Sequence, residues 1–200
     1  MANPIDFYFD FSSPYGYFAS TRIDGLAARY GRSVTWRPIL LGAVFKITGQ
    51  QPLPAIPLKG DYANRDLARS ARLLGVPYRS PSKFPVSGTA PSRAYYWLAT
   101  RDGALAVKLA QALYRAYFAE DRDISSPQVT AGVAAGLGLE KEQVLQALDD
   151  PAVKERLKAE VDAAIARGVF GSPFIIVDEE PFWGSDRLDQ VEKWLATGGW

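Results

Sequence analysis

Two serine–proline pairs stand out as residues that could take part in chemistry: Ser13-Pro14 follows a strand-like run, and Ser172-Pro173 precedes one. Ser13 lies within FDFSSPYGYF, where a strand pattern gives way to a helical one. A serine here can cap the helix through its side-chain oxygen, and a proline suits the first helical position. A helix start also presents N–H donors and partial positive charge, which stabilise an anion such as a thiolate. The pattern therefore allows a structural cap or an anion site.

Composition narrows the chemistry, because the chain has no cysteine and no histidine. It cannot form a disulfide, a zinc–sulfur site, a Ser-His-Asp triad or an HExxH zinc site. Its carboxylates show no metal-ligand spacing. A serine hydroxyl without a histidine base has no obvious activation, but it can donate a hydrogen bond to a thiolate that arrives on a ligand. One such bond, about 1.5–3 kcal/mol, lowers a thiol pKa by roughly one to two units.

The bulk properties favour an ordinary globular enzyme or binding protein. The 200 residues are 48% hydrophobic and carry a formal net charge of +1, which argues against nucleic acid or an anionic membrane as a partner. No run of 18 uncharged apolar residues predicts a membrane span. The opening MANPIDFYFDF lacks the basic region of a signal peptide, so we expect a cytoplasmic protein.

The order of predicted elements indicates an α/β fold. Aromatic and β-branched runs predict strands at 5–9, 33–40, 174–177 and 181–183, with Pro38 near an edge. A helix over 14–30 separates the first two strands, and the Pro/Gly-rich segment that follows them predicts a long functional loop. Further helices are predicted at 62–74, 91–100, 104–118, 127–135, 139–148, 150–168 and 186–196. This order is typical of a thioredoxin-like fold with an inserted all-helical domain. We expect residues 1–45 and 169–200 to form the thioredoxin-like domain, 46–168 the insertion, and helix 150–168 the connector.

Two segments near the C-terminus could complete a site. Ser172-Pro173 precedes a predicted strand, and it is either a simple strand opening or a cis-proline loop that faces Ser13 and holds a peptide ligand by backbone hydrogen bonds. In FWGSDRLD, Ser185 or Asp186 can cap the last helix. The same turn, with Arg187, could instead hold the charged groups of a peptide-like ligand.

These segments resemble a known family. DFYFDFSSPYGYF and GVFGSPFIIVDEEPFWGSDRL, with DRDISSP and LKGDYANRDLAR between them, look like the 2-hydroxychromene-2-carboxylate isomerases. Those enzymes are relatives of kappa-class glutathione transferases and of periplasmic disulfide oxidoreductases. The resemblance implies a homodimer, glutathione as cofactor, and a role in aromatic compound catabolism. The implied reaction is cis–trans isomerisation by reversible addition of the glutathione thiolate to an activated alkene.

The resemblance also implies roles for particular residues. Ser13 is expected to hydrogen-bond the glutathione sulfur, and Ser172, before a cis Pro173, to pair its backbone with the ligand. The γ-glutamyl end would be taken by Ser185, Asp186 and Arg187.

Two positions depart from the family pattern. Gln50 lies where family members often place an asparagine that contacts glutathione. Lys46 and Phe84 fall in segments expected to border the second substrate, and isomerases of the family can carry a tyrosine at the latter place. Phenylalanine lacks that hydroxyl.

Alternative functions stay open. The same site could run glutathione conjugation or peroxide reduction, as in kappa-class transferases. The fold could instead hold a peptide or metabolite without chemistry. A Ser-Lys hydrolase is disfavoured, because Ser13 is followed by Pro-Tyr-Gly and lacks the flanking glycines of a nucleophile elbow. The aromatic group Tyr95–Trp97 is expected to pack in the core.

Overall fold

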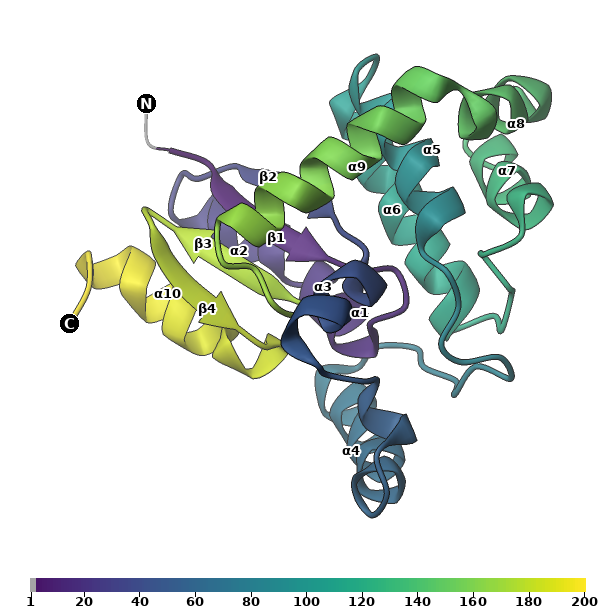
Figure 1. Ribbon diagram of the computed structural model, residues 1–200. Coiled ribbons are helices and arrows are strands. Elements are labelled where there is room, and N and C mark those ends of the chain that lie inside the picture. Colours follow the sequence, from purple (N-terminus) through teal and green to yellow (C-terminus); the bar gives the residue numbers. More distant parts are fainter. Residues whose placement is uncertain (1–2) are drawn as a thin grey trace.

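A computed structural model describes residues 3–200 of the chain, and a four-stranded sheet lies at its centre (Figure 1). The strands are β1 (Ile5–Phe9), β2 (Val34–Pro38), β3 (Phe174–Val177) and β4 (Glu180–Trp183), in the order β2-β1-β3-β4. β1 pairs parallel with β2 and antiparallel with β3, and β3 pairs antiparallel with β4. The predicted strands are therefore confirmed, and β2 with its Pro38 is an edge strand as expected.

The helix predicted over 14–30 is wrong as a single element. It is divided into α1 (Pro14–Ser20) and α2 (Ile23–Arg29). At the break, the Ser20 hydroxyl donates to the Tyr17 carbonyl (2.7 Å) and the Thr21 hydroxyl donates to the Phe18 carbonyl (2.8 Å). Such local side-chain bonds compete with helix continuation, and the apolar spacing continues across the break, so periodicity does not reveal it.

The long loop predicted after β2 is also wrong in part. It begins with α3 (Leu41–Thr48), which ends at Gly49 in the left-handed conformation, and it contains a 3₁₀ turn, η1 (Leu53–Ala55). The next helix, α4 (Lys59–Leu74), starts earlier than predicted and projects away from the sheet (Figure 1). We call residues 49–58, between α3 and α4, the strap.

Helices inserted between β2 and β3 form the second part of the molecule. Beyond α4 they are α5 (Thr89–Ala99), α6 (Gly103–Phe118), α7 (Pro127–Ala135), α8 (Lys141–Asp149) and α9 (Pro151–Ala166). α9 runs from this group back to the sheet (Figure 1), and after β4 the chain ends in η2 (Ser185–Arg187) and α10 (Leu188–Thr197). The predicted α/β fold with a helical insertion is confirmed; the stated bounds of its two domains stay a prediction.

The hydrophobic core is continuous between the two parts. Phe9 and Phe11 pack against Tyr114 of α6 with their rings tilted, and the ring centroids are 5.6 Å and 5.3 Å apart. The hydroxyls of Tyr95 and Tyr96 in α5 donate to carbonyls of β2 (2.8 Å each), so these buried aromatic residues pack as expected. The aromatic contacts fix the insertion against the end of β1. Within residues 3–200, no helix is long and apolar enough to cross a bilayer.

Candidate functional site

The β1–α1 junction places Ser13 at the N-cap of α1. Its hydroxyl oxygen accepts a hydrogen bond from the Gly16 N–H (3.0 Å), and Pro14 occupies the first helical position. The same hydroxyl donates to the Ser172 carbonyl (2.8 Å), so it bridges two segments that lie 159 residues apart. Ser13 is therefore both a cap and part of a tertiary contact, and only 6% of it is exposed. Because α1 has only 7 residues, hydrogen bonds rather than the helix dipole dominate its start.

The loop before β3 faces this junction. The Ser172–Pro173 peptide bond is cis, which confirms the prediction of a cis-proline loop. The Ser172 hydroxyl accepts a hydrogen bond from the Asp10 N–H (2.8 Å). The hydroxyl and the carbonyl of Ser172 are therefore both hydrogen-bonded to the β1–α1 junction. This loop therefore presents its backbone next to the Ser13 hydroxyl.

The carboxylate of Asp10 ties the junction to the neighbouring helix. It accepts from the Ser12 N–H and hydroxyl (2.7 Å each) and from the Leu41 N–H at the start of α3 (2.6 Å). Burial raises the pKa of this carboxyl above its ordinary value, and these hydrogen bonds act in the opposite direction. Through these contacts Asp10 supports the turn between β1 and α1.

Gly16, three residues after Ser13, is a glycine for a steric reason. A Cβ at Gly16 would lie 2.5 Å from the Tyr114 hydroxyl and 2.9 Å from the Ser172 hydroxyl. The Tyr114 hydroxyl donates to the Asp10 carbonyl (2.9 Å), and burial raises its pKa well above the usual value. Tyr114 therefore fills the space that a second side chain on α1 would need, and only glycine leaves it enough room.

The turn after β4 supplies charged groups. Gly184 lies in the left-handed region (φ 117°), and its N–H donates to the Pro173 carbonyl (3.1 Å). The Arg187 guanidinium pairs with the Asp186 carboxylate (2.8 Å). Neither Ser185 nor Asp186 makes a side-chain cap to α10, so that alternative is wrong. Both residues line the cavity described next.

A cavity of about 910 Å³ brings these segments together. It is at the large end of the roughly 300–1,000 Å³ range of small-molecule sites. Lys46 and Pro173 are not among the residues that line it; Lys46 is exposed on α3, and Pro173 is buried. The predicted site residues that do line it are Ser13, Gln50, Phe84, Ser172, Ser185, Asp186 and Arg187.

Several cavity residues escaped sequence analysis. Tyr15 donates its hydroxyl to the Asp66 carboxylate on α4 (2.9 Å), and burial together with Asp66 raises the Tyr15 pKa. Lys59, at the start of α4, is an exposed cation on the cavity wall. LKGDYANRDLAR contains both α4 residues, but nothing local in the sequence shows that α4 folds against α1.

This arrangement can bind and polarise rather than attack. Its most deeply placed polar group is a serine hydroxyl without a histidine to deprotonate it. The hydroxyl and the backbone beside it can hold an extended peptide-like ligand and donate to an anionic atom on it.

Comparisons with known proteins identify the family to which the chain belongs. The family described as a DSBA-like thioredoxin domain matches residues 4–196. The chain is similar to a Sphingobium xenophagum 2-hydroxychromene-2-carboxylate isomerase, at 30% identity over 98% of this chain and 99% of that protein. It is also similar to a Caenorhabditis elegans glutathione S-transferase kappa 2, at 30% identity over 96% of this chain and 91% of that protein. A solved 2-hydroxychromene-2-carboxylate isomerase superposes with a TM-score of 0.87, at 30% identity, over 96% of this chain and 94% of that one. The resemblance seen in the motifs is confirmed.

Proposed function

From the premise that this chain belongs to the DSBA-like thioredoxin domain family, we propose that it is a glutathione-dependent enzyme of the 2-hydroxychromene-2-carboxylate isomerase type. Similar proteins are named for that isomerase and for kappa-class glutathione transferase. The function rests on the cavity at the β1–α1 junction, where Ser13 and Gly16 stand in the places that redox proteins of this fold give to two cysteines.

The residues at this site fit a tripeptide thiol. Ser172 can offer its backbone to the cysteinyl unit, as a strand would. Arg187 and Ser185 suit the γ-glutamyl carboxylate, and Asp186 suits the ammonium group. Lys59 is the remaining cation on the cavity wall and suits the glycyl carboxylate, while Gln50 can contact either end through its amide.

Ligand binding would exchange one hydrogen bond for two. The Ser13 hydroxyl donates to the Ser172 carbonyl at 2.8 Å. A cysteinyl N–H that takes over this carbonyl releases the Ser13 proton, which can then be donated to the ligand sulfur. Capture of the peptide backbone and stabilisation of the thiolate are thereby coupled through a single rotation of the Ser13 hydroxyl.

When bound, glutathione would supply a thiolate for reversible addition to an activated alkene, in which the former double bond becomes single, can rotate, and forms again when the thiolate is eliminated. The chain's own part is to keep the sulfur anionic and to position the acceptor. A charge-assisted hydrogen bond from Ser13 contributes about 1.5–3 kcal/mol to the anion. The Gly16 N–H keeps the Ser13 oxygen in place while its proton is redirected. No protein nucleophile is needed, which is compatible with a chain that has neither cysteine nor histidine.

The observation that carries this proposal is the Ser13–Ser172 pair at the wall of the cavity. Calorimetry with glutathione tests it. We expect the wild-type protein to bind glutathione more tightly than S-methylglutathione, because methylation removes the thiolate. The preference should largely disappear in Ser13→Ala. Absence of glutathione binding to the wild type would refute the proposal.

A second candidate is conjugation or peroxide reduction of the kappa type, favoured by the absence of a phenolic hydroxyl at Phe84. Cis–trans isomerisation of an activated alkene compared with conjugation of chlorodinitrobenzene separates the two. A non-catalytic binding module would show neither activity, and Ser13→Ala would leave its ligand affinity unchanged. The homodimer and the cytoplasmic location stay predictions.

A further inference from the structure

The sheet order places the cavity at one end of the sheet. The register pairs Phe9 with Pro38, Tyr8 with Phe174, and Phe174 with Trp183. One end of the sheet therefore carries the C-terminal ends of β1, β2 and β4 and the start of β3. The residues that line the cavity at this end come from α3, from Ser13 and Ser172, and from the turn after β4.

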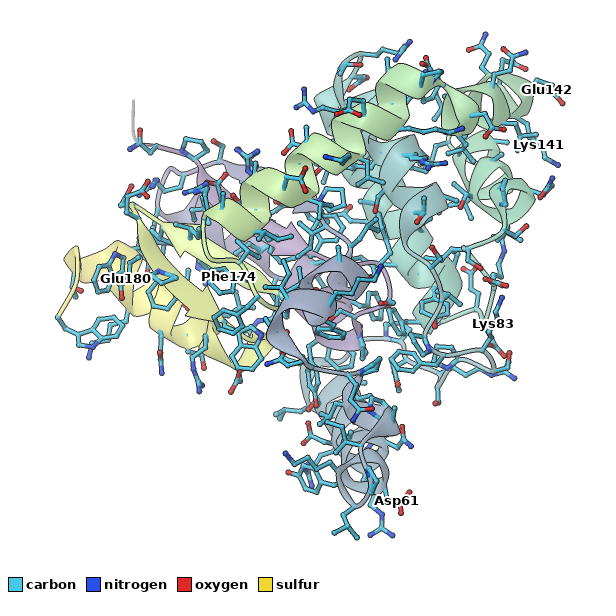
Figure 2. The ribbon with its side chains drawn as sticks, in the orientation of Figure 1. Asp61, Lys83, Lys141, Glu142, Phe174 and Glu180 are labelled. Carbon is cyan, nitrogen blue, oxygen red and sulfur yellow. The ribbon has the colours of Figure 1, made fainter. Side chains whose placement is uncertain are left out.

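The end next to α3 is uncharged and largely apolar, and we call it the acceptor half. It is formed by Leu41 and Phe45 of α3, by Phe84 and Pro85, and by the strap, which contributes Leu53 and Ile56 together with the amides of Gln50 and Gln51. Figure 2 shows Lys83, the neighbour of Phe84, on the opposite side of α1 and α3 from Phe174 and Glu180 of the sheet. Within residues 3–200, the charged side chains on the cavity wall come from α4 and η2, and the acceptor half has none.

The cations of the cavity are matched to the tripeptide. Lys59 and Arg187 are the two cations among the described lining residues, and the same wall carries two acids, Asp66 and Asp186. Glutathione has two carboxylates. If it binds as proposed above, both cations have partners, and no cation is left for a carboxylate on a second substrate.

Lys46, which lies in a segment expected to border the second substrate, is exposed and does not line the cavity. In a helix with 3.6 residues per turn, Leu41 and Phe45 share one face, and the next residue is rotated by about 100°. Leu41 and Phe45 line the cavity, whereas Lys46 is exposed and outside it. A carboxylate placed among Phe45, Phe84 and Leu53 would lose part of its hydration without a cation to pair with, which disfavours its binding.

We propose that the acceptor half takes an uncharged, apolar aryl compound with an alkene conjugated to a ketone, and that it discriminates against the corresponding carboxylate. This inference rests on the proposed glutathione site and names the second substrate's class. It separates this protein from an enzyme built for an anionic chromene carboxylate.

A matched ligand pair tests the proposal without turnover. 4-Phenylbutan-2-one and 2-oxo-4-phenylbutanoate are unreactive and differ only in a methyl group against a carboxylate. Calorimetry on the glutathione-saturated protein should show the ketone binding at least tenfold more tightly. Equal affinity, preference for the carboxylate, or binding of neither ligand would overturn the proposal.

Turnover of the unsaturated analogues extends the test. Loss of the Z isomers of 4-phenylbut-3-en-2-one and 2-oxo-4-phenylbut-3-enoate is followed and divided by the uncatalysed rate with glutathione, which corrects for intrinsic reactivity. The rate enhancement should be at least tenfold larger for the ketone. The opposite order would contradict the proposal.

Variants that add a charge test whether the residues of the cavity wall determine the preference for the ketone over the carboxylate. Phe84→Arg should shift the binding preference at least tenfold towards the carboxylate, whereas the size-matched Phe84→Leu should keep the preference for the ketone. Phe45→Arg with Phe45→Leu repeats the test on another element. Loss of carboxylate binding in Lys46→Ala would show that Lys46 reaches the substrate, and would overturn the proposal. Glutathione binding in each variant reports separately on the proposed function, because its failure would appear with the tripeptide alone.

Discussion

The two halves of the cavity are built in different ways. Around Ser13, four segments distant in sequence are joined by hydrogen bonds, with Asp10 and Tyr114 buried beneath them. The acceptor half is closed by the strap, in which Leu53 is 37% exposed and Leu58 94% exposed. The strap leads into α4, and Asp61 near the start of that helix lies far from the sheet (Figure 2).

This difference indicates a division of labour. A hydroxyl that must stabilise an anion has to be held in a defined direction, and the junction does so with buried, mutually satisfied polar groups. A surface that selects an acceptor needs only shape and low polarity, which exposed apolar side chains on a short connection can provide. Mutations should therefore affect folding at the junction and selectivity at the strap.

Removal of the Asp10 carboxylate should have the largest effect. Asp10→Ala leaves the Ser12 and Leu41 N–H groups without their acceptor, at about 1–3 kcal/mol for each buried donor. We expect a loss of about 3 kcal/mol in unfolding free energy, measured by urea denaturation. A loss below about 1 kcal/mol would show that the junction is not held by this carboxylate.

A methyl group at Gly16 should destabilise the junction somewhat less. Alanine in a helix is usually favoured over glycine by roughly 0.5–1 kcal/mol, but here its Cβ meets the Tyr114 and Ser172 hydroxyls. Overpacking of this kind costs about 1–3 kcal/mol, so we expect a net loss of about 1–2 kcal/mol. Gly16→Ala combined with Tyr114→Phe, which removes the nearest atom, should recover part of it. A stabilising Gly16→Ala substitution would show that the Tyr114 and Ser172 hydroxyls do not lie this close to position 16.

The pH dependence of stability should reveal the buried acid. Burial raises the folded-state pKa of Asp10 above the unfolded value of about 3.9. The folded chain therefore binds this proton more tightly than the unfolded chain does. The resulting contribution to stability is complete below the unfolded-state pKa and is lost as pH rises through the folded-state pKa. The stability difference between wild type and Asp10→Asn should thus shift against the wild type from pH 3 to pH 7. A difference that moves in the opposite direction would contradict the raised pKa.

Truncation in the strap should have the smallest effect on folding. Leu53→Ala removes a side chain that is already partly exposed, and we expect a change within about 0.5 kcal/mol in stability. The same truncation at the buried Leu109 of α6 should cost about 2–5 kcal/mol. Leu53→Ala should instead raise KM for an apolar acceptor while affinity for glutathione is unchanged. Comparable stability losses at the two positions would remove the distinction between the halves.

The sequence was sufficient for features encoded locally. Strand composition, the Ser13-Pro14 helix start and the helical spacing of the insertion predicted the sheet and its interruption correctly. The Ser172–Pro173 loop could be placed opposite Ser13 because the fold order brings the start of β3 beside the end of β1.

Features that depend on distant partners could not be predicted. α3 has no side-chain cap of its own, and its first N–H is bound by Asp10, 31 residues away. Once this segment is helical, Phe45 turns into the cavity and Lys46 turns out, which a loop prediction could not reveal. The Tyr15–Asp66 contact likewise depends on where α4 packs.

An ultraviolet titration of protein-bound glutathione tests the central claim most directly. If Ser13 donates to the sulfur, thiolate absorbance should appear roughly one to two pH units below the free thiol's pKa of about 8.5. In Ser13→Ala the bound thiol should titrate close to the free value. In Ser12→Ala, whose hydroxyl donates to Asp10 instead, the lowered pKa should persist. A bound thiol that titrates near 8.5 in the wild-type protein, or equally low in Ser13→Ala, would contradict the account.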